Sequence, residues 1–254
     1  MLLVLDVGNT NTTIGVYDGK KLIKHWRLTS KKQTVDEIGF TMHSLLDTFS
    51  IDETQITGAV YASVVPPLDD IFIQSVESYI GVKCLRVTSR IVKGLKIAMR
   101  NSTGIGADRL ANAVAGIEKY GYPLIIVDLG TAITLDVVSK DGAYLGGTIS
   151  PGMELGMNAL FEGTAKLPKI SLTAPQHRVG GNTIEALQSG IVYGTVGMVD
   201  TLIREINKEL GYECRLVATG GHSHIFTQYS TLVTDCDPWL TLDGLRIIYE
   251  RNVG

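Results

Sequence analysis

Two stretches of the chain place an aspartate and a glycine directly after an apolar run. The first reads LLVLDVGNTNTTIGVYDG (residues 2–19) and the second reads LIIVDLGTAITLDVVSKDG (residues 124–142). Turns rich in glycine, threonine and asparagine offer backbone N–H groups and hydroxyls that bind phosphate oxygens. An aspartate at the strand end can hold a cation, directly or through water. These residues predict the binding of a phosphate chain together with a metal ion.

The two stretches are copies of one device. Asp6 matches Asp128, Gly8 matches Gly130 and Thr12 matches Thr134, at an offset of 128 − 6 = 122 residues. Either turn alone would be an ordinary hairpin. Two copies favour a ligand-binding role over a purely structural turn, because a carboxylate beside a buried strand is costly unless it is paired or bound to a metal. We expect the two turns to hold a polyphosphate from both sides.

A third turn, Gly220-Gly221 in LVATGGHSHIF, follows another buried strand and would let a flat ring approach the backbone. Alone it would be an ordinary strand-to-helix turn. The combination of two phosphate turns and one adenosine turn resembles the actin-like ATPase superfamily. That resemblance implies an α/β fold of two ribonuclease H-like halves, with ATP in the cleft between them.

Alternating β-rich runs and helical patterns also favour an α/β architecture. The predicted strands are 2–7, 12–17, 22–28, 58–64, 83–87, 124–128, 133–139 and 214–219. The predicted helices are 36–48, 69–80, 105–119, 153–161, 182–210 and the C-terminal segment LTLDGLRIIYERN. Asn182 and Glu185 form a capping pattern at the start of the longest helix. Two copies are too few for a repeat array, so we predict two domains, 1–121 and 122–254.

Composition excludes several classes of protein. The formal net charge of −3, from 23 basic and 26 acidic residues, argues against nucleic acid as a partner. Three scattered cysteines indicate a reducing compartment without a structural zinc. The first apolar run is interrupted by Asp6 and lacks a basic start, so it is not a signal peptide. With no run long enough to cross a membrane, we expect a soluble cytoplasmic protein.

The segment NSTGIGADRLANA discriminates among members of the superfamily. Asp108 and Arg109 lie in the predicted first turn of a helix, after Gly104 and Gly106. Aspartate there could simply complement the helix dipole, worth about 0.3–1 kcal/mol. The functional interpretation is that Asp108 accepts a proton from a substrate hydroxyl. Arg109, with its planar guanidinium, would bind a carboxylate or the transferring phosphoryl group.

Seven ordered motifs between residues 2 and 252 resemble type III pantothenate kinases. They are DVGNTNT, GADRLANA, DLGTAIT, GGTISPG, GNTIEALQSGIVYG, ATGG and DPWLTLDGLRIIYERN. The resemblance implies phosphorylation of pantothenate to 4'-phosphopantothenate by ATP, the first step of coenzyme A biosynthesis. It also implies a cytoplasmic homodimer that uses magnesium and a monovalent cation, potassium or ammonium.

Family roles carry over by position. By this resemblance, the first ATP-binding loop consists of Asp6, Val7, Gly8, Asn9, Thr10, Asn11, Thr12 and Thr13. Further ATP contacts would come from Thr131, Gly220 and Gly221. The resemblance implies that Gly106, Ala107, Asp108, Arg109 and Thr183 contact pantothenate. Asp108 would be the proton acceptor, and Thr183 would lie near a dimer interface. Asp128 resembles the potassium or ammonium ligand, and Asp6 is the expected magnesium site, directly or through water.

One position departs from the family pattern. Met99 stands where many members have a tyrosine, about seven residues before the Gly-Ala-Asp-Arg motif. If that tyrosine contacts pantothenate, the contact is lost here or comes from another residue.

Two alternatives remain open: a kinase for another small hydroxylated acceptor, and a non-enzymatic regulator that binds ATP to change shape. Asp108 and Arg109 argue against the regulator, which would not need a proton acceptor.

Overall fold

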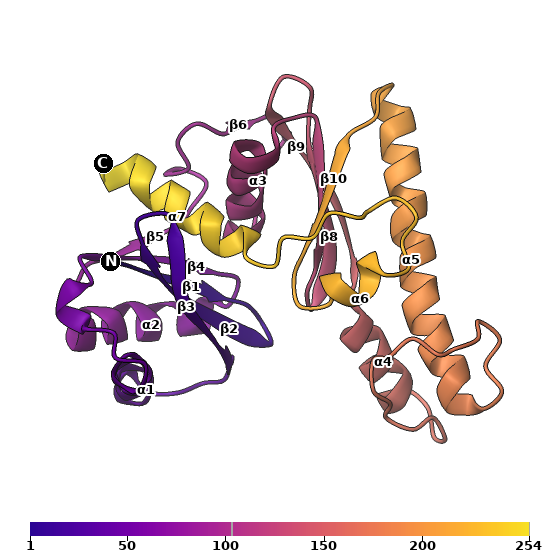
Figure 1. Ribbon diagram of the computed structural model, residues 1–254, viewed down its shortest axis with the longest axis horizontal. Coiled ribbons are helices and arrows are strands. Elements are labelled where there is room, and N and C mark those ends of the chain that lie inside the picture. Colours follow the sequence, from indigo (N-terminus) through magenta and orange to yellow (C-terminus); the bar gives the residue numbers. More distant parts are fainter. Residues whose placement is uncertain (103, 254) are drawn as a thin grey trace. The chain divides into compact units, whose positions relative to one another are not determined.

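The computed structural model describes residues 1–102 and 104–253 (Figure 1). The chain forms two compact units. The first contains Met1–Leu95, Arg100–Ala115 and the segment from Leu240 onward, and the second contains Lys96–Met99 and Gly116–Trp239. Each unit is built on its own five-stranded sheet, which agrees with the predicted α/β class.

The sheet of the first unit has the order β3-β2-β1-β4-β5. Its strands are β1 (Leu2–Val7), β2 (Asn11–Asp18), β3 (Lys21–Thr29), β4 (Gly58–Ser63) and β5 (Cys84–Arg86). The first three strands form an antiparallel meander, and β4 and β5 run parallel to β1. Because β1 and β4 run in the same direction, the turns that follow both strands lie at the same edge of the sheet.

Helices supply the rest of the core of the first unit. They are α1 (Val35–Thr48), α2 (Asp69–Ser75) with its π-helical continuation η3 (Val76–Ile80), the short 3-10 turns η1 (Glu53–Gln55) and η2 (Pro66–Leu68), and α7 (Leu240–Val253). Thr34 and Glu37 form a capping box at the start of α1. The apolar faces of α1 and α2 pack on side chains of β1 and β2, while α7 contacts β1 and β4.

The second unit repeats the meander. Its sheet has the order β10-β7-β8-β9-β6. The strands are β6 (Lys96–Ile97), β7 (Leu124–Leu129), β8 (Ala132–Val138), β9 (Ala143–Pro151) and β10 (Arg215–Thr219). Strands β7, β8 and β9 are antiparallel, and β10 runs parallel to β7. The helices that complete the unit are α4 (Met153–Glu162), α5 (Thr183–Leu210) and α6 (Ser223–Thr227).

The strand registers correct one detail of the repeat. Asp6 pairs with Thr13 across the first hairpin, and Asp128 pairs with Thr134 across the second. The threonine offset is therefore 134 − 13 = 121, whereas the aspartate offset is 122. The match of Thr12 with Thr134 was wrong, because the second turn has one residue fewer. A shift of one residue in a strand moves a side chain to the opposite face.

The units do not divide at one point near residue 121. Helix α3 (Ala107–Tyr120) belongs to the first unit up to Ala115 and to the second from Gly116. The packing explains this. Gly244 of α7 lies against the backbone of Ala111, and a Cβ at Gly116 would lie 2.7 Å from the side chain of Leu124. The chain then returns to the first unit through α7, which a division into 1–121 and 122–254 does not include.

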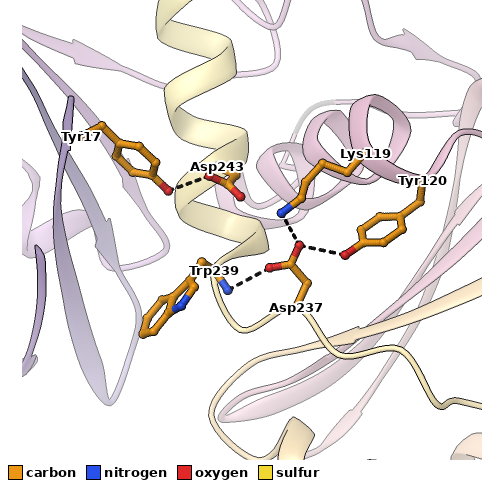
Figure 2. Close-up of polar contacts among 6 residues, drawn as sticks. All are labelled: Tyr17, Lys119, Tyr120, Asp237, Trp239 and Asp243. Atoms are coloured by element: carbon orange, nitrogen blue, oxygen red, sulfur yellow. Dashed lines mark hydrogen bonds and ion pairs between the residues drawn. The ribbon is translucent and has the colours of Figure 1, made fainter. Parts of the chain in front are cut away.

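Hydrogen bonds hold the segments around this return (Figure 2). In the first unit, Tyr17 donates to Asp243 Oδ1 at 2.8 Å and ties α7 to β2. In the second unit, Asp237 accepts from Tyr120 at 3.0 Å and from the backbone N–H of Trp239 at 3.2 Å, and it pairs with Lys119. Burial, together with Asp237, raises the pKa of Tyr120 to about 12. Asp237 therefore joins the end of α3 to the segment that leads into α7.

The predicted elements are present with small shifts at their ends. The structure also contains β6, β9 and α6, which the sequence patterns did not predict. Strand β9 was not recognised because two glycines and Pro151 interrupt its pattern. Across residues 1–102 and 104–253, no helix is long and apolar enough to span a membrane.

Candidate active site

The first phosphate turn connects β1 to β2. Asp6 is partly buried at the end of β1, and Asn9, Thr10 and Asn11 are exposed. The N–H of Gly8 donates to the carbonyl of Asn11 at 3.0 Å, which closes the turn. The result is a tight, polar loop that presents its amides and hydroxyls to solvent at the edge of the sheet, as phosphate binding requires.

The two threonines after this turn differ in accessibility. Thr12 is fully buried, and its Oγ1 lies 2.9 Å from the hydroxyl of Ser30. The N–H of Ser30 also donates to the carbonyl of Thr10 at 2.9 Å. Thr13, which pairs with Asp6 across the hairpin, is only partly buried. Thr12 thus anchors the turn internally, whereas Thr13 stands beside Asp6. Val7 is also fully buried and contributes backbone only.

The Gly-Ala-Asp-Arg stretch lies beside the first turn in the same unit. The N–H of Val64 donates to the carbonyl of Val7 at 3.1 Å, immediately before Gly8. A Cβ at Gly106 would lie 3.5 Å from Cγ1 of the same Val64. Val64, which the sequence analysis did not identify, therefore connects the end of β1 to the start of α3. No motif in the sequence distinguishes Val64 from other apolar residues at strand ends.

Asp108 occupies the first turn of α3. Its Oδ1 accepts a hydrogen bond from the backbone N–H of Arg109 at 2.8 Å, and the same oxygen lies directly against Gly106. Burial raises the pKa of Asp108 above the ordinary carboxyl value, opposed by the Arg109 N–H and the charge of Arg109. A partly desolvated carboxylate with a raised pKa is suited to accepting a proton. Ala107 is buried, and Arg109 is partly buried.

The second phosphate turn connects β7 to β8 in the other unit. The N–H of Gly130 donates to the carbonyl of Ala132 at 3.1 Å. Thr131 is exposed at the tip, and its carbonyl accepts from the N–H of Gly152 at 3.0 Å. Gly152 lies so close to the Gly130 and Thr131 carbonyls that no side chain would fit there. Gly152, at the start of α4, thus packs against the turn and holds it in place. The sequence analysis did not assign this role to Gly152.

The glycine pair after β10 packs against the end of β7. Gly220 has a φ of +89°, and a Cβ there would lie 2.5 Å from Asp128 Oδ1 and 2.7 Å from the Leu129 backbone. The N–H of His222 donates to the carbonyl of Leu129 at 3.1 Å, and Ser223 Oγ donates to the Gly220 carbonyl at 2.7 Å. Only glycine satisfies both the left-handed conformation and the close approach at position 220. Gly221 is exposed beside it.

The carboxylate of Asp128 lies between glycines. Its Oδ1 is close to Gly220, and a Cβ at Gly130 would lie 3.6 Å from the same oxygen. Among the described residues, no cluster of three or more His, Cys, Asp or Glu side chains could hold a metal ion. A cation at either turn would therefore be held by no more than two such side chains, together with backbone or hydroxyl oxygens and the phosphates of a ligand, which is usual for magnesium bound with a nucleotide.

Two predicted positions belong to other elements of the second unit. Thr183 is exposed as the first residue of α5, and the predicted cap is present, because Asn182 Oδ1 accepts from the Glu185 N–H at 3.0 Å. Met99 follows β6 and packs on β9, where its Sδ would lie 3.4 Å from a Cβ at Gly146. The first unit thus assembles Asp6–Thr13 with Gly106–Arg109, and the second assembles Asp128 and Thr131 with Gly220 and Gly221.

A duplicated α/β unit with a carboxylate-bearing hairpin turn defines the actin-like ATPase superfamily, and this chain has that fold. Solved structures with this likeness include a protein described as a Baf family transcriptional activator from Campylobacter jejuni. It has a TM-score of 0.61 at 20% identity, with 98% of each chain covered. The ADPNP-bound activator of the 2-hydroxyisocaproyl-CoA dehydratase from Clostridium difficile has a TM-score of 0.53 at 12% identity, covering 98% of this chain and 95% of that chain.

Sequence comparison identifies the family. A sequence model of the type III pantothenate kinases matches residues 2–205. The type III pantothenate kinase of Myxococcus xanthus (strain DK1622) is 43% identical over 253 residues, with 99% of both chains covered. That of an Exiguobacterium species (strain ATCC BAA-1283 / AT1b) is 44% identical, again with 99% of both chains covered. The chain belongs to the type III pantothenate kinase family.

Proposed function

We propose that this chain transfers the γ-phosphoryl group of ATP to the primary hydroxyl of pantothenate, giving 4'-phosphopantothenate and ADP in the first step of coenzyme A biosynthesis. The observation that carries the proposal is the link through Val64, which holds the carboxylate-bearing start of α3 beside the first phosphate turn. The proposed proton acceptor and phosphate-binding loop then share one compact unit. A protein that only switched shape on binding ATP would not need that arrangement.

The residues have distinct roles in this mechanism. Asp108 orients the pantothenate hydroxyl and takes its proton as the oxygen–phosphorus bond forms and the bond from the γ-phosphorus to the bridging oxygen of ADP breaks. Arg109 and the amides of the first turn offset negative charge on the transferring group. Thr131 supports the phosphates from the second turn. Gly220 packs that glycine turn against β7, and the exposed Gly221 leaves room for the adenosine. Kinase transition states need little early deprotonation, so Asp108 acts late.

Each turn has one carboxylate suited to a cation. Asp6, partly buried beside the exposed amides of its turn, would hold magnesium, directly or through water. Asp128, set between Gly130 and Gly220, would hold potassium or ammonium. These cations supply positive charge that neutralises the phosphates when ATP is bound. Carboxylate, hydroxyl and backbone oxygens fit both types of ion.

We further propose a cytoplasmic homodimer. The three cysteines, Cys84, Cys214 and Cys236, are free thiols, which suits a reducing compartment. The exposed face of α5 between Ala186 and Thr201 carries small residues, with open space around Gly190, Gly194 and Gly197. Such a face allows two helices to approach closely. Large apolar side chains are also exposed on α4 and around the start of α5, namely Leu155, Leu160, Phe161, Val179 and Ile184.

A bulky charge on that face tests the dimer. Gly194→Arg should leave the fold of the subunit intact, because nothing lies within 4 Å of a Cβ at this position, but it should convert a dimer to a monomer. Light scattering after size-exclusion chromatography reads the mass. Gly194→Ala, which adds one methyl group, is the matched control. A Gly194→Arg protein that remains fully dimeric would remove this face of α5 from the interface.

ADP formation by the purified protein tests the reaction itself. We expect turnover that requires pantothenate and that is higher in potassium than in sodium buffer. Turnover with another hydroxylated acceptor but not with pantothenate would support a different kinase. ATP binding without turnover on any acceptor, in potassium or in ammonium, would support the regulator. A Thr183→Val variant tests the role of Thr183. A rise in its KM for pantothenate, without a rise in its KM for ATP, would assign Thr183 to the substrate site.

A further inference from the structure

The hydroxyl of Thr219 is an unusual buried group. Thr219 ends β10, and only 1% of the residue is exposed. Its Oγ1 has no hydrogen-bond partner among the residues that the structure describes. Leaving a buried hydroxyl unsatisfied costs about 1–3 kcal/mol, and native proteins have few such groups. A valine would fill the same volume without this cost. The hydroxyl is therefore available to a partner that is not part of the polypeptide.

The sheet register places this hydroxyl beside Asp128. Thr219 and Asp128 are direct partners on the parallel strands β10 and β7, and neighbouring residues in register project to the same face of a sheet. The Asp128 carboxylate also extends toward β10, because its Oδ1 lies against Gly220, the residue after Thr219. A carboxylate and a buried hydroxyl without a hydrogen-bond partner therefore belong to paired residues at the end of the two strands.

The other unit provides an internal comparison. There the equivalent strand pair is β1 with β4, and the partner of Asp6 is Ala62. The two carboxylates thus have the same place in the duplicated fold, but their partners on the parallel strand differ: a threonine beside Asp128 and an alanine beside Asp6. A magnesium ion keeps several waters and is bound by one or two carboxylates and phosphates, so it does not need a further protein oxygen. Such an oxygen is useful to a larger monovalent ion that exchanges its hydration shell for protein oxygens.

We propose that Thr219 Oγ1 is a second protein ligand, with Asp128, for the monovalent cation. The inference rests on the proposed cation at Asp128. Potassium would accept the hydroxyl oxygen as a neutral ligand, and ammonium would donate a hydrogen bond to it. Thr219 therefore favours a singly charged cation at the second turn, whereas Ala62 leaves the first turn to magnesium.

The test is a thermal unfolding titration with potassium chloride at constant ionic strength, balanced with tetramethylammonium chloride, in saturating ADP and magnesium. The wild-type melting temperature should rise with potassium. Thr219→Val should melt at or above the wild-type temperature without potassium, since the orphaned hydroxyl is gone. Its half-maximal potassium concentration should be at least tenfold higher. Thr219→Ser, which keeps the hydroxyl, is the matched control and should respond within about threefold of wild type.

Two results would overturn the proposal. One is a Thr219→Val protein with the wild-type potassium response. The other is a large fall in its melting temperature without potassium, which would mean that the hydroxyl is already satisfied within the fold. Pantothenate-dependent ADP formation, measured separately, keeps the two hypotheses distinct. Potassium-dependent unfolding without turnover would refute the kinase and keep the cation site, whereas turnover without any potassium effect on unfolding would refute the cation site alone.

Discussion

Replacing Gly106 with alanine should separate the catalytic geometry from the stability of the fold. A Cβ at this position would overlap Asp108 Oδ1, while the next nearest atoms, Asp108 Cγ and Val64 Cγ1, lie at 3.4 and 3.5 Å. Gly106 is also not among the glycines with positive φ. The backbone therefore accepts alanine, and only the free end of one side chain has to move.

The size of the effect follows from that displacement. To restore an ordinary contact distance, the carboxylate oxygen must shift by about 1 Å, and a misplacement of about 1 Å costs on the order of 10²-fold in rate. At about 1.36 kcal/mol for each factor of ten, this is about 2.7 kcal/mol of lost transition-state stabilisation. The free energy of unfolding should stay within about 1 kcal/mol of wild type or rise slightly, because alanine restricts the unfolded chain more than glycine does.

Steady-state ADP formation and thermal unfolding measure the two quantities on the same protein. Gly156→Ala is the matched control, because its Cβ would make only an ordinary contact, 3.6 Å from Ile191 Cδ1, and it should retain wild-type turnover. Adding Gly106→Ala to Asp108→Asn should cost nothing further, since both changes act on one carboxylate. Wild-type kcat in Gly106→Ala, or a full additional loss in the double variant, would refute the role of this contact.

Three further predictions concern the carboxylates. Asp108→Asn should bind ATP normally but lose most turnover, and wild-type turnover would remove Asp108 as the proton acceptor. Because the pKa of Asp108 is raised in the folded state, the native protein binds this proton more tightly than the unfolded chain. Wild type should therefore lose stability relative to Asp108→Asn as pH rises from the ordinary carboxyl pKa through the raised one, which urea unfolding at several pH values would show. Asp128→Ala should weaken the dependence of turnover on potassium, and an unchanged potassium response would assign the cation elsewhere.

Local signals predicted most of the fold. Apolar runs with strand or helix periodicity, and caps such as Asn182, depend on neighbouring residues and can be read directly from the sequence. Strand β9 was missed because Gly146, Gly147 and Pro151 interrupt its alternation. A glycine is needed at 147, where a Cβ would overlap the carbonyl of Leu135 on the paired strand β8. Tertiary packing, not local propensity, determines that strand.

The division into units was harder to predict for the same reason. Helix α3 is continuous in sequence pattern, yet its two parts pack on different elements, and α7 returns to the sheet at which the chain begins. No local signal records that return. The chemistry-bearing residues were identified from their types and from the family resemblance. Their supporting contacts, Val64 against Gly106 and Gly152 below the second turn, depend on residues that look ordinary in the sequence.

The duplication gives each of the two proposed cations a hairpin of its own. Both hairpins present an aspartate at the end of the first strand and a threonine opposite it, Thr13 in one and Thr134 in the other. Their differences lie in the parts that surround the carboxylate. The first turn is one residue longer and has a methyl group on the neighbouring strand, whereas the second is held between glycines and has a buried hydroxyl beside it. Divergence at the neighbouring strand, and not at the aspartate itself, is therefore what would distinguish a magnesium site from a monovalent one.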